Sequence, residues 1–351
     1  EKLRHFFIFN TKLKQIIDFE QTKIFESATV DTNILLCGRT GQDSFSFQKA
    51  LPDQNNLLYT MNVKELSSQS FTLQPPEIIA IRNKVEKIGI PLKNWNIKIN
   101  YGIKTGFNEA FIIDEVKRNE LIKQDQSSEE LIKPILRGKD IKAYEKNWAG
   151  LWGIATFPSL NLNINNYPAI KNHLLSFGKD RLEQLGQKLP DGRKSRKKST
   201  NKWFETQDPI AYFGELEKAK IVYPCIMADK SRFCLDNDKC HPIAPANLIT
   251  GDEIRFLLPI LNSRFIYFLF RKFYMGGGIE GELKTNNLQK LPVPHVPKDL
   301  QQYFVELTYK ITQNIQDNQD ASYLVNKIDQ LVYKLYGLTV EEIEIVENST
   351  Q

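Results

Sequence analysis

Residues 100–114, NYGIKTGFNEAFIID, and residues 131–141, LIKPILRGKDI, carry the most informative pattern in this sequence. Each stretch holds a short polar turn, Lys104-Thr105 between two glycines in the first and Arg137-Gly138-Lys139-Asp140 in the second. Apolar residues that are suited to pack inward flank both turns. Polar side chains on such turns can bond phosphate oxygens and base edges. We therefore predict DNA contacts from Lys104, Thr105, Asn108, Arg137 and Lys139.

A structural interpretation of the same turns stays open. The glycines can serve only to permit tight turns, while Asn108 and Asp140 cap nearby backbone groups. In the functional interpretation, a bidentate pair of Arg with guanine or of Asn with adenine contributes about 1–3 kcal/mol of discrimination. Turns that recur in domains with different target sequences would form the scaffold and would not determine sequence specificity. Less familiar loops are therefore alternative candidates for base contacts. These are residues 161–166, 228–239 and 276–282.

The pattern around these turns predicts a mixed α/β region. Residues 95–114 are expected to form a hairpin around Gly102–Gly106, and Ser127 with Glu130 forms a capping box that opens a short helix. Pro134 should end or kink that helix. Further on we expect strands over residues 148–156 and 220–227, a helix over 167–185 and a hairpin over 233–243.

The second half of the sequence is increasingly helical. The apolar spacing predicts helices over residues 252–261, 264–273, 298–318 and 321–336, and three glycines at 276–278 should break the second of them. Gly337 is a natural stop, and Thr339 with Glu342 forms a capping box for a last helix. A short helix over residues 78–88, after Pro75-Pro76, is expected to link this region to the first 70 residues.

The first 70 residues have the pattern of the end of an α/β sheet. A helix is expected over residues 2–10, and buried strands over 14–19 and 32–39. A turn at residues 41–44 leads into the alternating stretch 44–51, SFSFQKAL. We expect this stretch to close an antiparallel hairpin with the strand before it.

Four stretches in order resemble a known family. Residues 100–141, WFETQDPIAYFGELEKAKIVYPCI (203–226), LPILNSRFIYFLF (258–270) and LQKLPVPHVP (288–297) are similar to the TaqI-like C-terminal specificity (target-recognition) domain. That domain belongs to bacterial type II, IIG-like restriction-modification adenine-specific DNA methyltransferases. Residues 16–36 also resemble the end of their catalytic domain. The resemblance implies an α/β (α+β) fold in three parts: residues 1–72 end a Rossmann-like methyltransferase sheet, 73–296 are a mixed α/β target-recognition domain, and 297–351 are a helical tail.

Composition and charge fit a DNA-binding protein with a distinct end. The 351 residues are 41% hydrophobic and carry a net charge of +5. Residues 301–351 hold eight acidic residues against three lysines, a local charge of −5, which leaves +10 on the rest. The sequence lacks a run of eighteen apolar residues and a signal-peptide start, and its four cysteines are scattered. We therefore expect reduced thiols, a cytoplasmic location and no membrane partner.

The strongest electrostatic feature is residues 188–203, KLPDGRKSRKKSTNKW, with a charge of +6. Its glycine, serines and threonine favour a loop that can follow a phosphate backbone and release counterions. The alternative is a solvated surface loop, with Trp203 and Phe204 anchoring its base in the core. In the functional interpretation, the contacting residues are Arg193, Lys194, Arg196, Lys197, Lys198 and Lys202.

Catalytic motifs are absent from the sequence. Methyltransferases that act on an exocyclic amine carry a glycine-rich cofactor loop and an N/D-P-P-Y/F tetrapeptide, whereas the only double proline here is Gln74-Pro75-Pro76-Glu77. The resemblance implies that both motifs lie upstream of Glu1, and that S-adenosylmethionine serves the full-length parent and not this fragment. The spacing of Cys234, Cys240 and His241 argues against a zinc site, and Asp191 with Glu282 and Lys284 makes a poor nuclease pair.

The sequence thus favours a DNA recognition module of a restriction-modification adenine methyltransferase, with or without a fused endonuclease. Its partners would be double-stranded DNA and the upstream methyltransferase domain of the same protein. Two alternatives stay open. One is a stand-alone specificity subunit that recruits separate methylase and nuclease chains. The other is a protein-interaction module whose basic loop binds an acidic partner.

Overall fold

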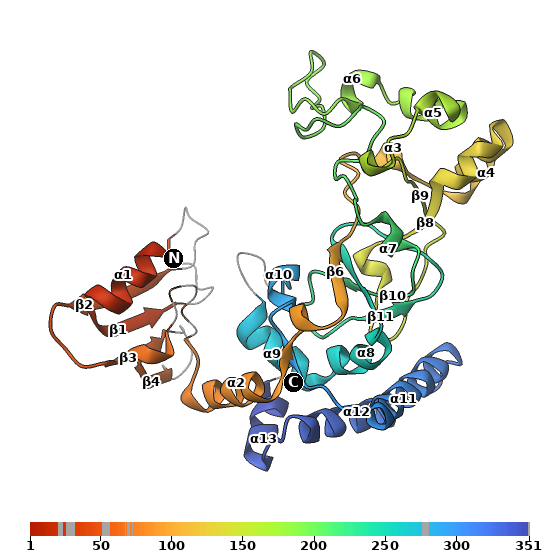
Figure 1. The fold of residues 1–351 in the computed structure, drawn as a ribbon. Coiled ribbons are helices and arrows are strands. Elements are labelled where there is room, and N and C mark those ends of the chain that lie inside the picture. The colour runs from red at the N-terminus through yellow and green to blue at the C-terminus, as the bar shows by residue number, and fades with distance from the viewer. Residues whose placement is uncertain are drawn as a thin grey trace. The chain divides into compact units, whose positions relative to one another are not determined.

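The computed structural model describes residues 1–19, 24–25, 32–50, 57–66, 68, 71, 73–275 and 281–349. Contacts divide the chain into two compact units, Glu1–Lys84 and Val85–Gln351 (Figure 1). The described residues form several small sheets and many helices, which confirms the mixed α/β class. Among them no helix is both long enough and apolar enough to cross a bilayer.

The first unit is built on a four-stranded sheet. Helix α1 (Lys2–Asn10) precedes strands β1 (Lys12–Asp18), β2 (Asn33–Gly38), β3 (Ser44–Lys49) and β4 (Leu57–Asn62), in the order β2-β1-β3-β4. The predicted hairpin of residues 32–39 with 44–51 is wrong, because β1 lies between β2 and β3 and pairs in parallel with β3. Alternation fixes which face of a strand is buried, but it does not fix the neighbour with which the strand pairs. Strand β4 completes the sheet and was not predicted.

The second unit holds two further four-stranded sheets and a two-stranded pair. The first sheet has the order β11-β10-β13-β6 and is antiparallel throughout. The second has the order β12-β8-β9-β7 and includes the parallel pair of β12 and β8. The strands are β5 (Ile90–Pro91), β6 (Ile97–Tyr101), β7 (Ile112–Ile113), β8 (Ile132–Leu136), β9 (Trp152–Ile154), β10 (Lys220–Pro224), β11 (Cys234–Asp236), β12 (His241–Pro242), β13 (Ala246–Gly251) and β14 (Pro292–Val293).

Neither hairpin predicted for this unit forms. Strand β6 pairs with β13, and β7 pairs with β9, so residues 95–114 join two different sheets. Likewise β11 pairs with β10 while β12 pairs with β8. Close approach explains Gly102, since a Cβ there would lie 2.2 Å from the carbonyl oxygen of Ala246. The glycine was predicted to permit a turn, but it permits the contact of two strands.

Short helices connect the strands of this unit. The main ones are α4 (Glu115–Gln124) and α5 (Pro168–Leu175), with single turns at α3 (Asn108–Phe111), α6 (Lys179–Leu182), α7 (Phe213–Leu216) and α10 (Thr285–Leu288). The helix predicted over residues 167–185 is interrupted by Gly178, whose φ is +89°. The predicted Ser127–Glu130 capping box is also wrong. Asp125 instead caps a 3₁₀ turn by accepting from Ser127 N at 3.1 Å, and Pro134 lies within β8.

The helical end of the chain packs on the first sheet of this unit. Helices α8 (Ile254–Asn262) and α9 (Arg264–Leu269) contact α11 (Lys298–Gln316), α12 (Ser322–Leu335) and α13 (Val340–Ser349), as Figure 1 shows. Arg264 joins Asp329 of α12 to Glu347 of α13. The predicted cap of α13 is confirmed, because Thr339 N donates to Glu342 Oε2 at 2.8 Å and Glu342 N to Thr339 Oγ1 at 3.3 Å. The expected break at residues 276–278 lies outside the described residues.

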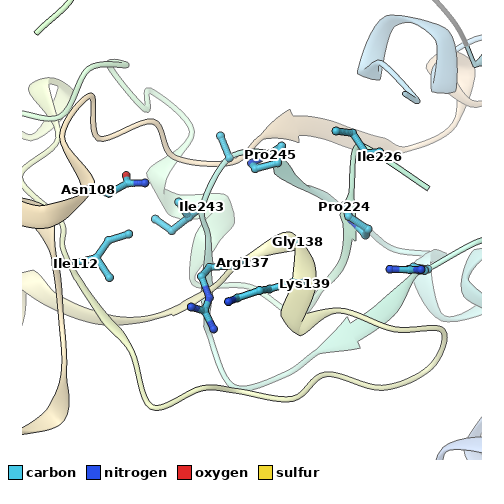
Figure 2. A pocket seen from close by; sticks show the side chains of 11 residues that line it. Asn108, Ile112, Arg137, Gly138, Lys139, Pro224, Ile226, Ile243 and Pro245 are labelled. Carbon is cyan, nitrogen blue, oxygen red and sulfur yellow. The ribbon is translucent and has the colours of Figure 1, made fainter. Parts of the chain in front are cut away.

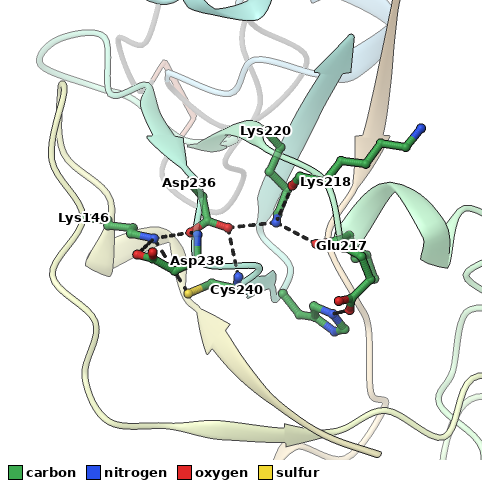
Figure 3. Close-up of polar contacts among 9 residues, drawn as sticks. Lys146, Glu217, Lys218, Lys220, Asp236, Asp238 and Cys240 are labelled. Carbon is green, nitrogen blue, oxygen red and sulfur yellow. Dashed lines mark hydrogen bonds and ion pairs between the residues drawn. The ribbon is translucent and has the colours of Figure 1, made fainter. Parts of the chain in front are cut away.

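A buried ionic cluster lies at the start of β10 (Figure 3). Lys220 and Asp236 are both 0% exposed and their Nζ and Oδ2 atoms are 2.8 Å apart, with Lys146 on the other side of the carboxylate. Cys240 N also donates to Asp236 Oδ2 at 2.9 Å. Burial raises the pKa of Asp236, but Lys220 and Lys146 outweigh burial and hold that pKa below its usual value. The carboxylate therefore stays charged and fixes β10, β11 and the 237–240 turn together.

Replacing this carboxylate should destabilise the second unit strongly. Asp236→Asn leaves Lys220 buried without its counter-charge, and breaking one partner of a buried pair costs about 3–5 kcal/mol. Urea denaturation of the full chain measures the change in the free energy of unfolding. The control is Lys142→Ala, whose partner Glu145 lies in a more exposed pair and whose loss should cost under about 1 kcal/mol. An equal effect of both variants would contradict the role of the cluster.

Candidate nucleic-acid interface

The first predicted turn, Lys104-Thr105, is held by its own side chains. Thr105 is buried, donates from Oγ1 to Asn108 Oδ1 at 2.6 Å and accepts from Phe107 N at 3.1 Å. Thr105 therefore shapes the turn, and its hydroxyl is already satisfied within it. Lys104 is 57% exposed and lies 3.8 Å from Asp208. Lys104 and Asn108 remain available on the surface.

The second predicted turn combines a structural ion pair with an exposed lysine. Arg137 donates from Nε to Asp140 Oδ2 at 2.9 Å and from Nη2 to Asp140 Oδ1 at 2.8 Å, and Asp140 also caps the Arg137 backbone N–H. The predicted capping role of Asp140 is confirmed. Burial raises the pKa of Asp140, but Arg137 outweighs it and leaves the pKa low. Lys139 is exposed and makes no ion pair with any described residue.

The fold brings the two predicted turns together at adjoining pockets. One, of about 400 Å³, is lined by Lys104, Thr105 and Asn108. The other, of about 450 Å³, is lined by Asn108, Arg137 and Lys139 (Figure 2). Asn108, Ile243 and Ala244 line both. Although some thirty residues separate the turns in sequence, the non-local strand pairings place them on one surface.

Arg196 sits beneath the basic loop as a structural residue. It is 4% exposed, and its guanidinium donates only to backbone carbonyls within the described residues. Nε donates to Leu182 O (2.7 Å), Nη1 to Thr105 O (2.9 Å) and Glu205 O (2.7 Å), and Nη2 to Trp203 O (2.6 Å). Burial lowers its pKa to about 10, so it stays charged at neutral pH. We leave Arg196 out of the DNA-contacting set, because it is buried and four of its five N–H groups already bond backbone carbonyls.

The other basic residues of the loop point to solvent. Arg193 pairs with Asp191, and Lys202 lies 3.7 Å from Glu205. Lys194, Lys197 and Lys198 are exposed and make no ion pair with any described residue. Trp203 is half-buried and Phe204 buried in the core of the second sheet, which confirms their predicted anchoring role. Because Arg196 bonds Thr105, the loop base lies directly beside the first turn.

Sequence reasoning missed some residues at this surface. Arg232, Pro224 and Ile226 line the same pocket as Arg137 and Lys139. Only Arg232 falls in a stretch that was named as an alternative reader, residues 228–239, and no motif singled it out. No group of three or more His, Cys, Asp or Glu side chains suited to a metal ion occurs among the described residues.

Residues 133–293 match the family model of the TaqI-like C-terminal specificity domain. This part of the chain is a TaqI-like specificity domain. The matched residues contain the second turn and the basic loop, and the first turn lies just before them. Strand β6 nevertheless pairs with β13 inside the matched region, so residues 97–101 share a sheet with the matched residues.

Relatives with sequence similarity are methyltransferases. The type II methyltransferase M.MjaIV of Methanocaldococcus jannaschii is 26% identical over 253 residues, which cover 67% of this chain and 77% of that protein. The type II methyltransferase M.BstVI of Geobacillus stearothermophilus is 23% identical over 100% of this chain and 64% of its own length. Among solved structures, the type IIL restriction-modification enzyme MmeI in complex with DNA matches with a TM-score of 0.58 and 12% identity. That match covers 97% of this chain and 46% of the MmeI chain, and it shows a shared fold.

Weakening the Arg196 contacts should loosen the base of the loop. Arg196→Lys keeps the charge but cannot reach four separate carbonyls, so we expect a loss of roughly 3 kcal/mol of stability. Hydrogen exchange of residues 182–207 should speed up more than that of β10 and β13. Arg193→Lys, at the exposed partner of Asp191, is the matched control and should leave exchange unchanged. If exchange in Arg196→Lys is no faster at residues 182–207 than at β10 and β13, these bonds do not hold the loop.

Proposed function

We propose that this chain is the sequence-specific DNA recognition module of a restriction-modification adenine methyltransferase. The observation that carries the proposal is the meeting of two polar turns beside a basic loop on one face of a TaqI-like specificity domain. Exposed lysines without ion pairs suit phosphate oxygens, whose contacts position a duplex. Amide and guanidinium groups on turns suit base edges.

The residues proposed to contact DNA fall into groups according to the ion pairs and hydrogen bonds that they make in the free chain. Lys139, Lys194, Lys197 and Lys198 make no ion pair with described residues and would take phosphates most readily. Lys104 and Arg193 would exchange a partly exposed carboxylate for a phosphate, and Lys202 would leave the buried carboxylate of Glu205 for one. Asn108 would read a base, because Thr105 fixes the orientation of its amide, and Arg137, which Asp140 holds in place, would take a phosphate. Thr105 would support Asn108 and make no DNA contact itself.

A methyltransferase domain of the same protein is the second proposed partner. In the first unit, Leu3, Phe6 and Phe9 are each at least 51% exposed and recur on one side of α1. Ile34 and Leu36, also half exposed, share one face of edge strand β2. Exposed apolar side chains at a sheet edge mark a surface that a further domain covers. We propose that residues 1–72 complete that domain, that 73–296 recognise DNA and that 297–351 form its helical tail.

The catalytic partner would supply the chemistry. S-adenosylmethionine would bind to that domain, whose tetrapeptide would also take the extruded adenine, since this sequence holds neither motif. Acting on the DNA of its own cell, the protein would work in the cytoplasm. A stand-alone specificity subunit fits less well, because it leaves the four-stranded sheet of the first unit without an assigned role.

Selection from a randomised duplex library tests the function. The full chain is titrated at two salt concentrations, and the retained duplexes are sequenced. We expect one short motif and binding that weakens steeply as salt rises. Salt-sensitive binding without a motif would favour the polyanion-binding alternative, and no binding at low salt would rule out DNA as the partner.

Single lysine substitutions should change the salt dependence by defined steps. Lys139→Ala and Lys198→Ala should each lower the slope of log K against log salt by about 1, while the selected motif stays the same. The control is Lys334→Ala, which removes an exposed lysine from α12 and should leave the slope unchanged. If all three variants keep the slope of the unsubstituted chain, these lysines do not contact phosphates.

A further inference from the structure

The pocket between the second turn and the end of β10 has an unusual lining. Its volume is about 450 Å³, and three of its residues, Arg137, Lys139 and Arg232, are cationic. None of its lining residues is a carboxylate, but Asp140 and Asp229 pair with Arg137 and Arg232 from outside the lining. The remainder are Asn108, Gly138 and an apolar set, Ile112, Pro224, Ile226, Ile243, Ala244 and Pro245. A site that combines cations with an apolar lining fits a ligand with one anionic group and one flat apolar body.

We propose that this pocket binds a single unstacked nucleotide, with its base against the apolar wall and its phosphate at the cations. The proposal rests on the proposed function and deepens it, because it adds a second nucleotide site on the specificity domain. It would be separate from the site of methyl transfer, whose tetrapeptide is absent from this sequence. The volume lies within the range of small-molecule sites.

The base end is defined by Asn108 and the apolar side chains around it. Figure 2 shows Asn108 and Ile112 on one side of the pocket, facing Pro224 and Ile226 across it, with Ile243 between them. Asn108 Oδ1 accepts the Thr105 hydroxyl at 2.6 Å, which orients the amide and leaves Nδ2 as a donor for a base acceptor. Enzymes that bind a flipped base hold it in this way, with hydrogen bonds to its edge and apolar contacts to its faces.

The phosphate end is preorganised by packing and by one ion pair. Gly138 rests on Pro224, since a Cβ at Gly138 would lie 3.2 Å from the Pro224 Cβ. The two bonds from Arg137 to Asp140 fix its guanidinium, and Nη1 makes no hydrogen bond to any described residue. Lys139, beside Arg137 in Figure 2, is exposed and makes no ion pair with described residues. Side chains already held in place lose less entropy when they bind an anion.

Two sources could supply such a nucleotide. One is an extrahelical nucleotide of the bound duplex, and the other is a free nucleoside monophosphate. A base that is stacked and paired within a duplex cannot enter the pocket. Its faces and its pairing edge are already covered by neighbouring bases, and these are the surfaces that the pocket would contact. The same contacts would serve both sources, so the test needs one arm for each.

The first arm uses free ligands and the full chain. The four deoxynucleoside 5′-monophosphates and orthophosphate are titrated separately by calorimetry. We expect at least one nucleotide to bind ten-fold more tightly than orthophosphate. Ile226→Trp, at a residue that is 40% exposed, fills the apolar end and should lower nucleotide affinity at least ten-fold. The control Val116→Trp, at a 77% exposed residue of α4, should not. Equal affinity for nucleotides and orthophosphate, or equal affinity in both variants, would exclude free nucleotides as the source.

The second arm uses the selected duplex with 2-aminopurine at each position in turn. We expect fluorescence to rise several-fold at one position on binding to the wild-type chain, and to stay low with Ile226→Trp although the duplex is still bound. Such a result assigns the pocket to an extrahelical nucleotide. Nucleotide binding without any fluorescence rise assigns it to free nucleotides. Duplex binding with neither response would overturn the proposal while leaving the proposed function intact, and absence of duplex binding would count against the function alone.

Discussion

The candidate interface depends on one guanidinium group. Arg196 bonds four carbonyls that belong to the Thr105 turn, to α6 and to residues 203–205. Backbone carbonyls in an irregular loop have no strand or helix partner, and leaving them unpaired in the interior costs free energy. One planar guanidinium with five N–H donors can bond all four carbonyls at once, which a lysine cannot do. The exposed lysines of the loop are thus held next to Lys104 by a basic residue that does not itself face solvent.

The cations of this chain therefore divide by their surroundings. Arg196, Lys220 and Lys146 are inside the fold, where they neutralise carboxylates or satisfy carbonyls. Arg137 is intermediate, since Asp140 holds part of its guanidinium and the rest faces a pocket. Lys194, Lys197 and Lys198 on the loop surface make no ion pair with any described residue. A buried cation is costly without its partners, so the structural group cannot be released to bind DNA without unfolding its site.

Much of the helical end could be predicted from sequence, because helices form from local contacts. The Thr339–Glu342 cap, the stop at Gly337 and the extent of α11 and α12 all follow from neighbouring residues. The strands β6 and β11 were expected in the correct places but with the wrong partners, since hairpin pairing was assumed. Pairing between distant strands leaves no local signal. For the same reason the sequence indicated both polar turns but did not indicate that Asn108 lies between them.

Charge alone also does not reveal the buried, bonded state of one residue of the basic loop. In the sequence, Arg196 is indistinguishable from Lys197 and Lys198, and all three contribute equally to the +6 charge of residues 188–203. The only local difference is that an arginine stands among lysines. A position that must bond several carbonyls at fixed angles requires a guanidinium, whereas one that must only attract phosphates accepts either cation. Arginine within a lysine-rich surface loop is thus a position where a structural role should be weighed before a binding role.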